Sequence, residues 1–146
     1  MNPNKICFIT CVNDDMTYAE SLRYIRQLEV PPGMEVETLS VREAPSMTAG
    51  YNYAMKHSDA KYKVYLHQDV FIINRSFIHG LVSLFQKYPK LGLVGMAGAK
   101  QIPANGVWFD APRHWKWGQV YESSMGYMRE LIYQEVPGDY LAVQAV

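Results

Sequence analysis

The chain has 146 residues, of which 49% are hydrophobic and 13% aromatic, and its 14 basic and 14 acidic side chains cancel. That length and apolar content exclude a disordered chain and fit one domain, 1–146, that buries roughly two-thirds of its unfolded surface. Zero net charge argues against nucleic acid as a partner held by bulk electrostatics. No apolar stretch reaches the roughly 18 residues that a transmembrane segment needs.

Cysteine usage indicates a reducing compartment. Cys7 and Cys11 are four residues apart in an apolar run that predicts a strand, so their side chains stand too far apart for a disulfide. Because reduced thiols are typical of the cytoplasm, we expect a cytoplasmic protein.

The chain opens with a predicted strand and helix. Residues 5–12 (KICFITCV) form an apolar run, rich in β-branched and aromatic side chains, that predicts a buried central strand. Apolar residues then recur at helical spacing from Tyr18 to Leu28, before a Pro-Pro-Gly turn. Asp14 or Asp15 is a suitable N-cap for this amphipathic helix.

Strands and helices continue to alternate after this helix. Alternation over 34–42 predicts a second strand, and a short helix follows over about 47–57. A third strand is expected at 63–70 (KVYLHQDV), then a third helix that ends at Lys87, then a strand at 91–97. This order is typical of an α/β fold with an open, mostly parallel sheet, right-handed crossovers and flanking helices.

The last third of the chain has a weaker pattern. Residues 101–128 form a segment rich in proline and aromatic side chains without a clear period. Two further short strands are expected at 130–136 and 140–146, on either side of a Pro-Gly-Asp turn.

Polar side chains follow three of the predicted strands. They lie at 10–15, at Arg42 and Glu43, and at 67–69. In an open parallel sheet, ligands bind outside the carboxyl ends of the strands. We therefore expect the three clusters to meet at one edge of the sheet and to form a binding site there.

The His67-Gln68-Asp69 sequence is the strongest of these clusters. Side chains two apart on a strand point to the same side, so His67 and Asp69 can hold a divalent cation together. An alternative is that Asp69 caps a turn and His67 makes a buried polar contact. Both interpretations stay open on these residues alone.

Two other segments also allow a structural and a functional interpretation. Residues 13–15 can hydrogen-bond a nucleobase or ribose, or can simply cap the first helix. Residues 49–52 open the second helix, where free N–H groups favour an anion such as a diphosphate, although a plain helix start explains them equally well. No hydrolase-elbow, P-loop, zincin or C-x-x-C motif occurs.

Four segments together resemble a family 2-type glycosyltransferase: ICFITCVND, YNYAM, VYLHQDVFI and LGLVGMAGAK. Within that family the chain is similar to the branch in which H-x-D replaces D-x-D. The resemblance covers 6–100 well and the aromatic segment through Trp117 more loosely. It implies a GT-A fold that binds a nucleotide-sugar donor, usually UDP-linked, with Mn²⁺ or Mg²⁺, and transfers the sugar to a hydroxyl of a carbohydrate or lipid-linked acceptor.

The resemblance also implies roles for individual residues. Asp69 matches the metal-binding last Asp of D-x-D, and His67 takes the place of the first, which removes one negative charge. Glu43, or its neighbour Arg42, stands where such enzymes place an acidic group toward uracil. Together with the candidates from the strand and helix ends, the expected donor-nucleotide site comprises Thr10, Asn13, Asp14, Arg42, Glu43, Asn52 and Gln68, and the expected metal site comprises His67 and Asp69.

The implied acceptor half is less complete. The family continues into a part that supplies the catalytic base, typically in an E-D-like motif, and the chain reaches Val146 without one. We therefore expect a fragment of a longer enzyme or a donor-binding domain without a complete acceptor site, with the catalytic base unassigned.

Other functions stay open. The alternative is a non-catalytic sugar-nucleotide-binding or regulatory domain. A further alternative is an interaction domain that uses residues 108–117 as a hydrophobic surface. Such a surface would also allow the chain to form an oligomer. A nucleotidyltransferase is disfavoured, because the loop after the first strand is acidic and lacks glycine.

Overall fold

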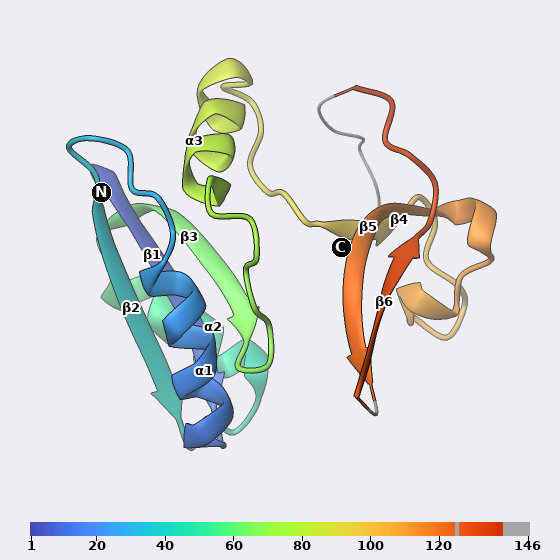
Figure 1. The fold of residues 1–146 in the computed structure, drawn as a ribbon, viewed down its shortest axis with the longest axis horizontal. Helices are drawn as coiled ribbons and strands as arrows, with labels where there is room; N and C mark the ends of the chain where they lie inside the picture. Colours follow the sequence, from blue (N-terminus) through green and yellow to red (C-terminus); the bar gives the residue numbers. More distant parts are fainter. Residues whose placement is uncertain (125, 139–146) are drawn as a thin grey trace. The chain divides into compact units, whose positions relative to one another are not determined.

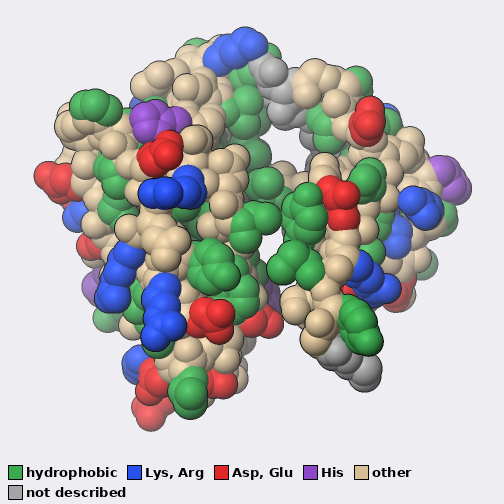
Figure 2. Space-filling view, in the orientation of Figure 1, with side chains coloured by type: hydrophobic (Ala, Val, Ile, Leu, Met, Phe, Trp, Pro, Cys, Tyr) green, Lys and Arg blue, Asp and Glu red, His purple; other side chains and the backbone are tan. Residues whose placement is uncertain are grey.

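A computed structural model describes residues 1–124 and 126–138, which belong to two compact units, 1–87 and 88–146 (Figure 1). The expected single domain stays a prediction, and the strand expected at 140–146 lies outside the described residues. Among the described helices, none combines the length and hydropathy needed to cross a bilayer. On the visible face of the first unit, acidic and basic side chains are interspersed (Figure 2).

A three-stranded parallel sheet forms the centre of the first unit. Strand β1 (Asn2–Val12) lies between β2 (Glu35–Arg42) and β3 (Ala60–His67), and both neighbours run parallel to it. The run Ile6–Thr10 is buried throughout, because both faces of a central parallel strand are covered. The predicted buried central strand is therefore confirmed, whereas β3 begins and ends three residues earlier than expected.

Helices cover both faces of this sheet. Helices α1 (Asp15–Arg26) and α3 (Phe77–Lys87) cover one face, and α2 (Met47–His57) covers the other. Alternate residues of β1 therefore enter two separate cores. The core on the α1 and α3 side consists of Ile6, Phe8, Ile25, Leu28, Tyr62, Leu66 and Ile78, and the core on the α2 side consists of Cys7, Ile9, Ala54 and Ala60.

Side-chain caps fix where α1 and α2 begin. Asp14 accepts hydrogen bonds from the N–H groups of Met16 and Thr17, and these bonds lower the pKa of its carboxyl group. Ser46 caps α2 by accepting from the N–H of Ala49 at 3.1 Å. The expected cap of α1 is thus confirmed, and both thiols of the chain, Cys7 and Cys11, are free.

The second unit contains an antiparallel sheet. Strand β5 (Lys116–Ser124) lies between β4 (Ala97–Ala99) and β6 (Tyr127–Ile132). Two one-turn 3-10 helices, Trp108–Asp110 and Arg113–Trp115, precede β5. The fourth strand was expected to join the parallel sheet, but β4 instead belongs to this antiparallel sheet.

The prediction of a strand at 91–97 is wrong. Residues 91–95 have no strand structure, Leu93 is 71% exposed, and the short β4 pairs with β5 and not with the parallel sheet. Strand β5 falls in the segment expected to be irregular. A Cβ at Gly118 would lie 2.3 Å from the carbonyl oxygen of Met96, so this strand requires a glycine where local propensity disfavours one.

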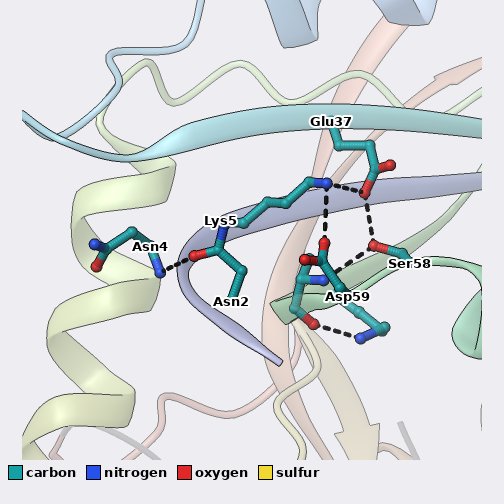
Figure 3. Close-up of polar contacts among 8 residues, drawn as sticks. Asn2, Asn4, Lys5, Glu37, Ser58 and Asp59 are labelled. Atoms are coloured by element: carbon teal, nitrogen blue, oxygen red, sulfur yellow. Dashed lines mark hydrogen bonds and ion pairs between the residues drawn. The ribbon is translucent and has the colours of Figure 1, made fainter.

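A polar network joins the three strands of the first unit near their amino ends (Figure 3). The Lys5 Nζ lies 3.0 Å from the Asp59 Oδ1 and 3.4 Å from the Glu37 Oε2. The Ser58 hydroxyl donates to the same Glu37 oxygen at 2.6 Å. The Ser58 hydrogen bond lowers the pKa of Glu37, and the hydrogen bond from Lys5 lowers the pKa of Asp59.

This network predicts an acid-sensitive contribution to stability. Both carboxyl pKa values are lower in the folded chain than in the unfolded chain. The network therefore stabilises the fold above about pH 4 and loses that contribution as the pH falls through the folded values. We expect Glu37→Gln to lower the free energy of unfolding by about 1 kcal/mol at pH 7, and by less at pH 3. Urea denaturation at both pH values measures this, with the exposed Glu20→Gln as control; an equal loss at both would contradict it.

The close approach of α2 to the end of β1 gives a second prediction. A Cβ at Gly50 would lie 2.5 Å from the Cys11 Sγ and 3.1 Å from the Ala44 Cβ. We expect Gly50→Ala to lower the free energy of unfolding by about 1 kcal/mol, since overpacking outweighs the gain in helix propensity. Adding Cys11→Ala should recover most of the loss.

Gly80 supplies the matched control for this measurement. It lies inside α3, and a Cβ there would meet no atom within 4 Å. Gly80→Ala should therefore raise the free energy of unfolding by up to about 1 kcal/mol. A Gly50→Ala variant as stable as Gly80→Ala would show that the contact with Cys11 is absent.

Candidate functional site

A cavity of about 310 Å³ lies at the carboxyl edge of the parallel sheet in the first unit. This volume is at the lower end of the range for small-molecule pockets, about 300 to 1,000 Å³. Side chains that follow all three strands line it. Five of the expected site residues are among them: Asn13, Glu43, His67, Gln68 and Asp69.

The strand register explains why these residues meet. Cys11 of β1 pairs with Val41 of β2 on one side and with His67 of β3 on the other. The chain therefore leaves all three strands at nearly the same level, and the residues that follow enclose one space. This is the edge of the sheet where the sequence predicted a binding site.

Gln68 joins the ends of β1 and β3. Its side-chain oxygen Oε1 accepts hydrogen bonds from the backbone N–H groups of Asn13, at 2.9 Å, and of Asp14, at 3.1 Å. Its nitrogen Nε2 donates to the Asn13 Oδ1 at 2.6 Å. Gln68 was expected to contact a nucleotide, but its amide group makes these contacts with the loop after β1.

A turn follows His67 directly. Strand β3 ends at this residue, and the N–H of Val70 donates to the His67 carbonyl oxygen at 3.2 Å. The Val70 carbonyl in turn accepts from the Ser21 hydroxyl at 3.0 Å, which anchors the turn to α1. Strand alternation therefore does not place Asp69 beside His67, as was expected, because Asp69 lies in the turn. Both side chains are nonetheless exposed and line the cavity.

The protein ligands available to a metal are few. Within 1–124 and 126–138, the structure contains no group of three or more His, Cys, Asp or Glu side chains placed to hold an ion. His67 and Asp69 can supply two ligands at most. A cation there would need oxygen atoms from a bound ligand or from water to complete its coordination.

Glu43 has an unusual backbone conformation. Its φ angle is +53°, in the left-handed region that residues other than glycine rarely adopt. Such a conformation costs of order 1 kcal/mol and often occurs where a side chain must be held at a binding site. The sequence singled out Glu43 by its position after β2 but gave no indication of this strain.

Four of the expected site residues do not line the cavity in the described part of the chain. Thr10 is 1% exposed and shares a face of β1 with Phe8, and its hydroxyl has no hydrogen-bond partner among the described residues. Asp14 uses its carboxylate oxygens to cap α1. Arg42 pairs with Asp15, with 2.6 Å between Nη2 and Oδ1. Asn52 is exposed on α2.

The start of α2 also lines the cavity, which the sequence analysis missed. Ser46 and Met47 line the cavity. Residues 49–52, which were expected to open the helix, lie instead within its first turns. The signal was present, because a serine before a helical segment is a typical N-cap. The Ser46 hydroxyl is occupied by the cap, so this helix start offers backbone groups rather than a free side chain.

Cys11 also lines the cavity, although it was not among the residues expected to bind the donor or the metal. Its thiol lies 3.8 Å from the Met47 carbonyl oxygen, and burial raises the pKa of the thiol. A raised pKa keeps this thiol protonated at neutral pH, so it is not an activated nucleophile. Cys11 therefore contributes shape to the cavity, next to Gly50.

One of two comparisons with known proteins identifies a family for this chain. The model of a family described as "Glycosyltransferase like family" matches residues 7–146, which include every residue lining the cavity. A comparison with curated proteins finds no match. Family membership indicates sugar transfer in general. Because the match covers nearly the whole sequence, the chain belongs to this glycosyltransferase-like family.

Proposed function

We propose that this chain binds a nucleoside-diphosphate sugar, UDP-linked, in the cavity at the carboxyl edge of its parallel sheet. The bound sugar is then transferred to a hydroxyl of a carbohydrate or lipid-linked acceptor. One observation carries the proposal: Asn13, Glu43 and the 67–69 turn follow three different strands and line one cavity. Membership in the glycosyltransferase-like family supports the same reaction class.

The cavity divides naturally between two parts of the donor. Asn13 and Glu43 offer hydrogen-bonding groups of the kind that recognise a nucleobase or ribose: an amide and a carboxylate. His67 and Asp69, on the other side, offer metal ligands. We therefore place the nucleoside near the ends of β1 and β2 and the diphosphate near the end of β3.

A divalent cation fits this proposal when it is shared with the donor. Asp69 would supply a carboxylate oxygen and His67 an imidazole nitrogen, and the diphosphate would supply further oxygens. An imidazole ligand favours Mn²⁺ over Mg²⁺. When bound, the cation neutralises the charge that develops on the leaving diphosphate. In the H-x-D pattern, Asp69 is then the anionic ligand and His67 the uncharged one.

A non-catalytic donor-binding domain is the second candidate. Glu43 and Asp69 are the carboxylates that line the cavity in the described part of the chain, and both have roles in donor binding under this proposal. An acceptor hydroxyl needs a further base. Release of UDP from a UDP-sugar with added acceptor distinguishes an enzyme from a binding domain.

We also propose a cytoplasmic location, in keeping with the two free thiols.

The proposed metal role of Asp69 gives a direct test. UDP at about 100 times its dissociation constant stabilises a protein by roughly 2.7 kcal/mol, which raises the melting temperature by several degrees. We expect UDP to produce such a rise, and Mn²⁺ to enlarge it. Asp69→Asn should abolish the additional effect of Mn²⁺, whereas the control Glu20→Gln on α1 should keep it. An unchanged Mn²⁺ effect in Asp69→Asn would remove the metal role, and no UDP effect in the unmodified chain would refute donor binding.

The strained backbone at Glu43 predicts opposite effects on stability and binding. Glu43→Gly relieves the left-handed conformation, so the free energy of unfolding should stay the same or rise by up to about 1 kcal/mol. The same change removes the carboxylate and should weaken UDP binding about tenfold. Chemical denaturation and calorimetric titration measure the two effects. Glu43→Gln keeps the strain and should weaken binding without a gain in stability; tight UDP binding by both variants would contradict the assignment.

A further inference from the structure

We infer that the second unit binds a phosphate monoester with an apolar carbon part, in a cavity beside the second 3-10 helix and the end of β6. This cavity has a volume of about 270 Å³. The residues that line it are Arg113, Lys116, Glu130, Leu131, Ile132 and Tyr133. All six belong to the second unit, so the inference does not depend on the cavity of the first unit or on the proposed transfer reaction.

Two cationic side chains reach this cavity from different elements. Arg113 begins the second 3-10 helix, and Lys116 begins β5. The Arg113 Nη2 donates to the Ile132 carbonyl oxygen at 3.1 Å. The Lys116 Nζ donates to the Phe109 carbonyl oxygen at 2.8 Å. These uncharged acceptors hold both side chains in place, but they do not compensate either positive charge.

Other arginines of the chain are paired with carboxylates. Arg129 on β6 donates two hydrogen bonds to Glu122, at 2.9 and 2.7 Å. In contrast, Arg113 and Lys116 have no ion pair with any carboxylate of the part of the chain that the structure describes. Each also retains N–H donors, because a guanidinium and an ammonium both carry more than the one donor used here. The two cations can therefore accept an anionic ligand.

Glu130 also lines the cavity, and its carboxylate opposes an anion. This carboxylate is engaged by two side chains of β5. Its Oε1 accepts a hydrogen bond from the Gln119 Nε2, and its hydrogen bond with Tyr121 raises the pKa of that phenol. Two positive charges and one negative charge still leave the lining positive, so the cavity attracts an anion.

The charges and the apolar lining together indicate the class of anion. A guanidinium can donate to two oxygens of a phosphate or a carboxylate. A second cation favours the phosphate monoester, which carries a charge of about −1.5 to −2 and three acceptor oxygens. Leu131 and Ile132 supply apolar surface, and the Tyr133 ring lies 5.4 Å from the Lys116 Nζ. This surface suits a carbon chain attached to the phosphate.

NMR titration of the full chain with butyl phosphate tests the site, because backbone amide shifts report where the ligand binds. We expect shifts at 113–116 and 130–133. Butyl phosphate should bind about tenfold more tightly than inorganic phosphate, since part of its chain becomes buried. Absence of shifts in these segments would overturn the inference. Pentanoate that binds as tightly as butyl phosphate would overturn the preference for a phosphate.

Charge variants test the residues that carry the inference. Arg113→Gln and Lys116→Gln should each weaken the binding of butyl phosphate about tenfold, because each removes a charge-assisted hydrogen bond. Arg23→Gln removes the same charge from an exposed position on α1 and should leave the affinity unchanged. An affinity unchanged in both Arg113→Gln and Lys116→Gln would overturn the site.

Glu130→Gln gives a test with the opposite sign. Removal of the opposing carboxylate should strengthen the binding of butyl phosphate about threefold. The control Glu20→Gln on α1 should not change it. Because a damaged fold would weaken binding, a gain in affinity cannot result from misfolding. Weaker or unchanged binding by a folded Glu130→Gln variant would contradict the inferred position of the anion.

A phosphate monoester can be a soluble metabolite or a lipid headgroup, and vesicles distinguish the two sources. The probes are vesicles of phosphatidylcholine with and without phosphatidic acid, whose headgroup is a phosphate monoester. Sedimentation with the phosphatidic acid vesicles that is lost in Lys116→Gln would assign the lipid headgroup. Binding of butyl phosphate without sedimentation would assign a soluble ester. Sedimentation that persists in Arg113→Gln and Lys116→Gln, with no binding of butyl phosphate, would overturn the inference.

Discussion

The parallel pairing of β1 with both of its neighbours is the constraint on which the first unit depends. Alternate residues of β1 enter cores on opposite faces, such as Phe8 toward α1 and α3 and Ile9 toward α2. A slip of one residue would exchange these faces and bury the wrong side chains, so the register is strongly specified. That same register sets Cys11 beside His67 and thereby fixes which loops meet at the carboxyl edge. The hydrophobic cores thus determine the position of the polar site.

The two edges of this sheet satisfy their polar groups in different ways. At the amino edge, the Glu37 carboxylate is paired with Lys5 and Ser58 within the protein. At the carboxyl edge, Glu43 and Asp69 line a cavity, and Glu43 has a strained backbone. A strained backbone such as that of Glu43 lowers stability, and it often occurs where a side chain must be held at a binding site. This contrast supports the proposed ligand site at the carboxyl edge independently of the comparison with known families.

The sequence predicted local features well and distant contacts poorly. The predicted bounds of α2, 47–57, agree with the structure because a run of helix-forming residues is a local signal, although its Ser46 cap was not recognised. The apolar run at 91–97 looked like a strand, yet strand formation depends on a partner, and its partner would have to come from elsewhere in the chain. The bonds of Gln68 to Asn13 span 55 residues and leave no local pattern. The general rule for parallel sheets predicted the edge where the loops meet, but the sequence did not predict the side-chain contacts there, such as those of Gln68 with the loop after β1 or of Arg42 with Asp15.

Replacing the first carboxylate of D-x-D by His67 has a consequence for how the proposed ligands depend on each other. An imidazole carries no negative charge in either protonation state, so a cavity with His67 repels a diphosphate less than one with two aspartates does. It also attracts a cation less strongly, and His67 and Asp69 supply only two protein ligands. The diphosphate would then supply oxygen ligands that the cation needs, and the cation would supply positive charge that the diphosphate needs. Because such coupling is reciprocal, a cation that tightens UDP binding must itself be bound more tightly when UDP is present. The turn that holds Asp69 is joined through Gln68 to the loop that holds Asn13, so the proposed metal and base positions share one hydrogen-bonded support.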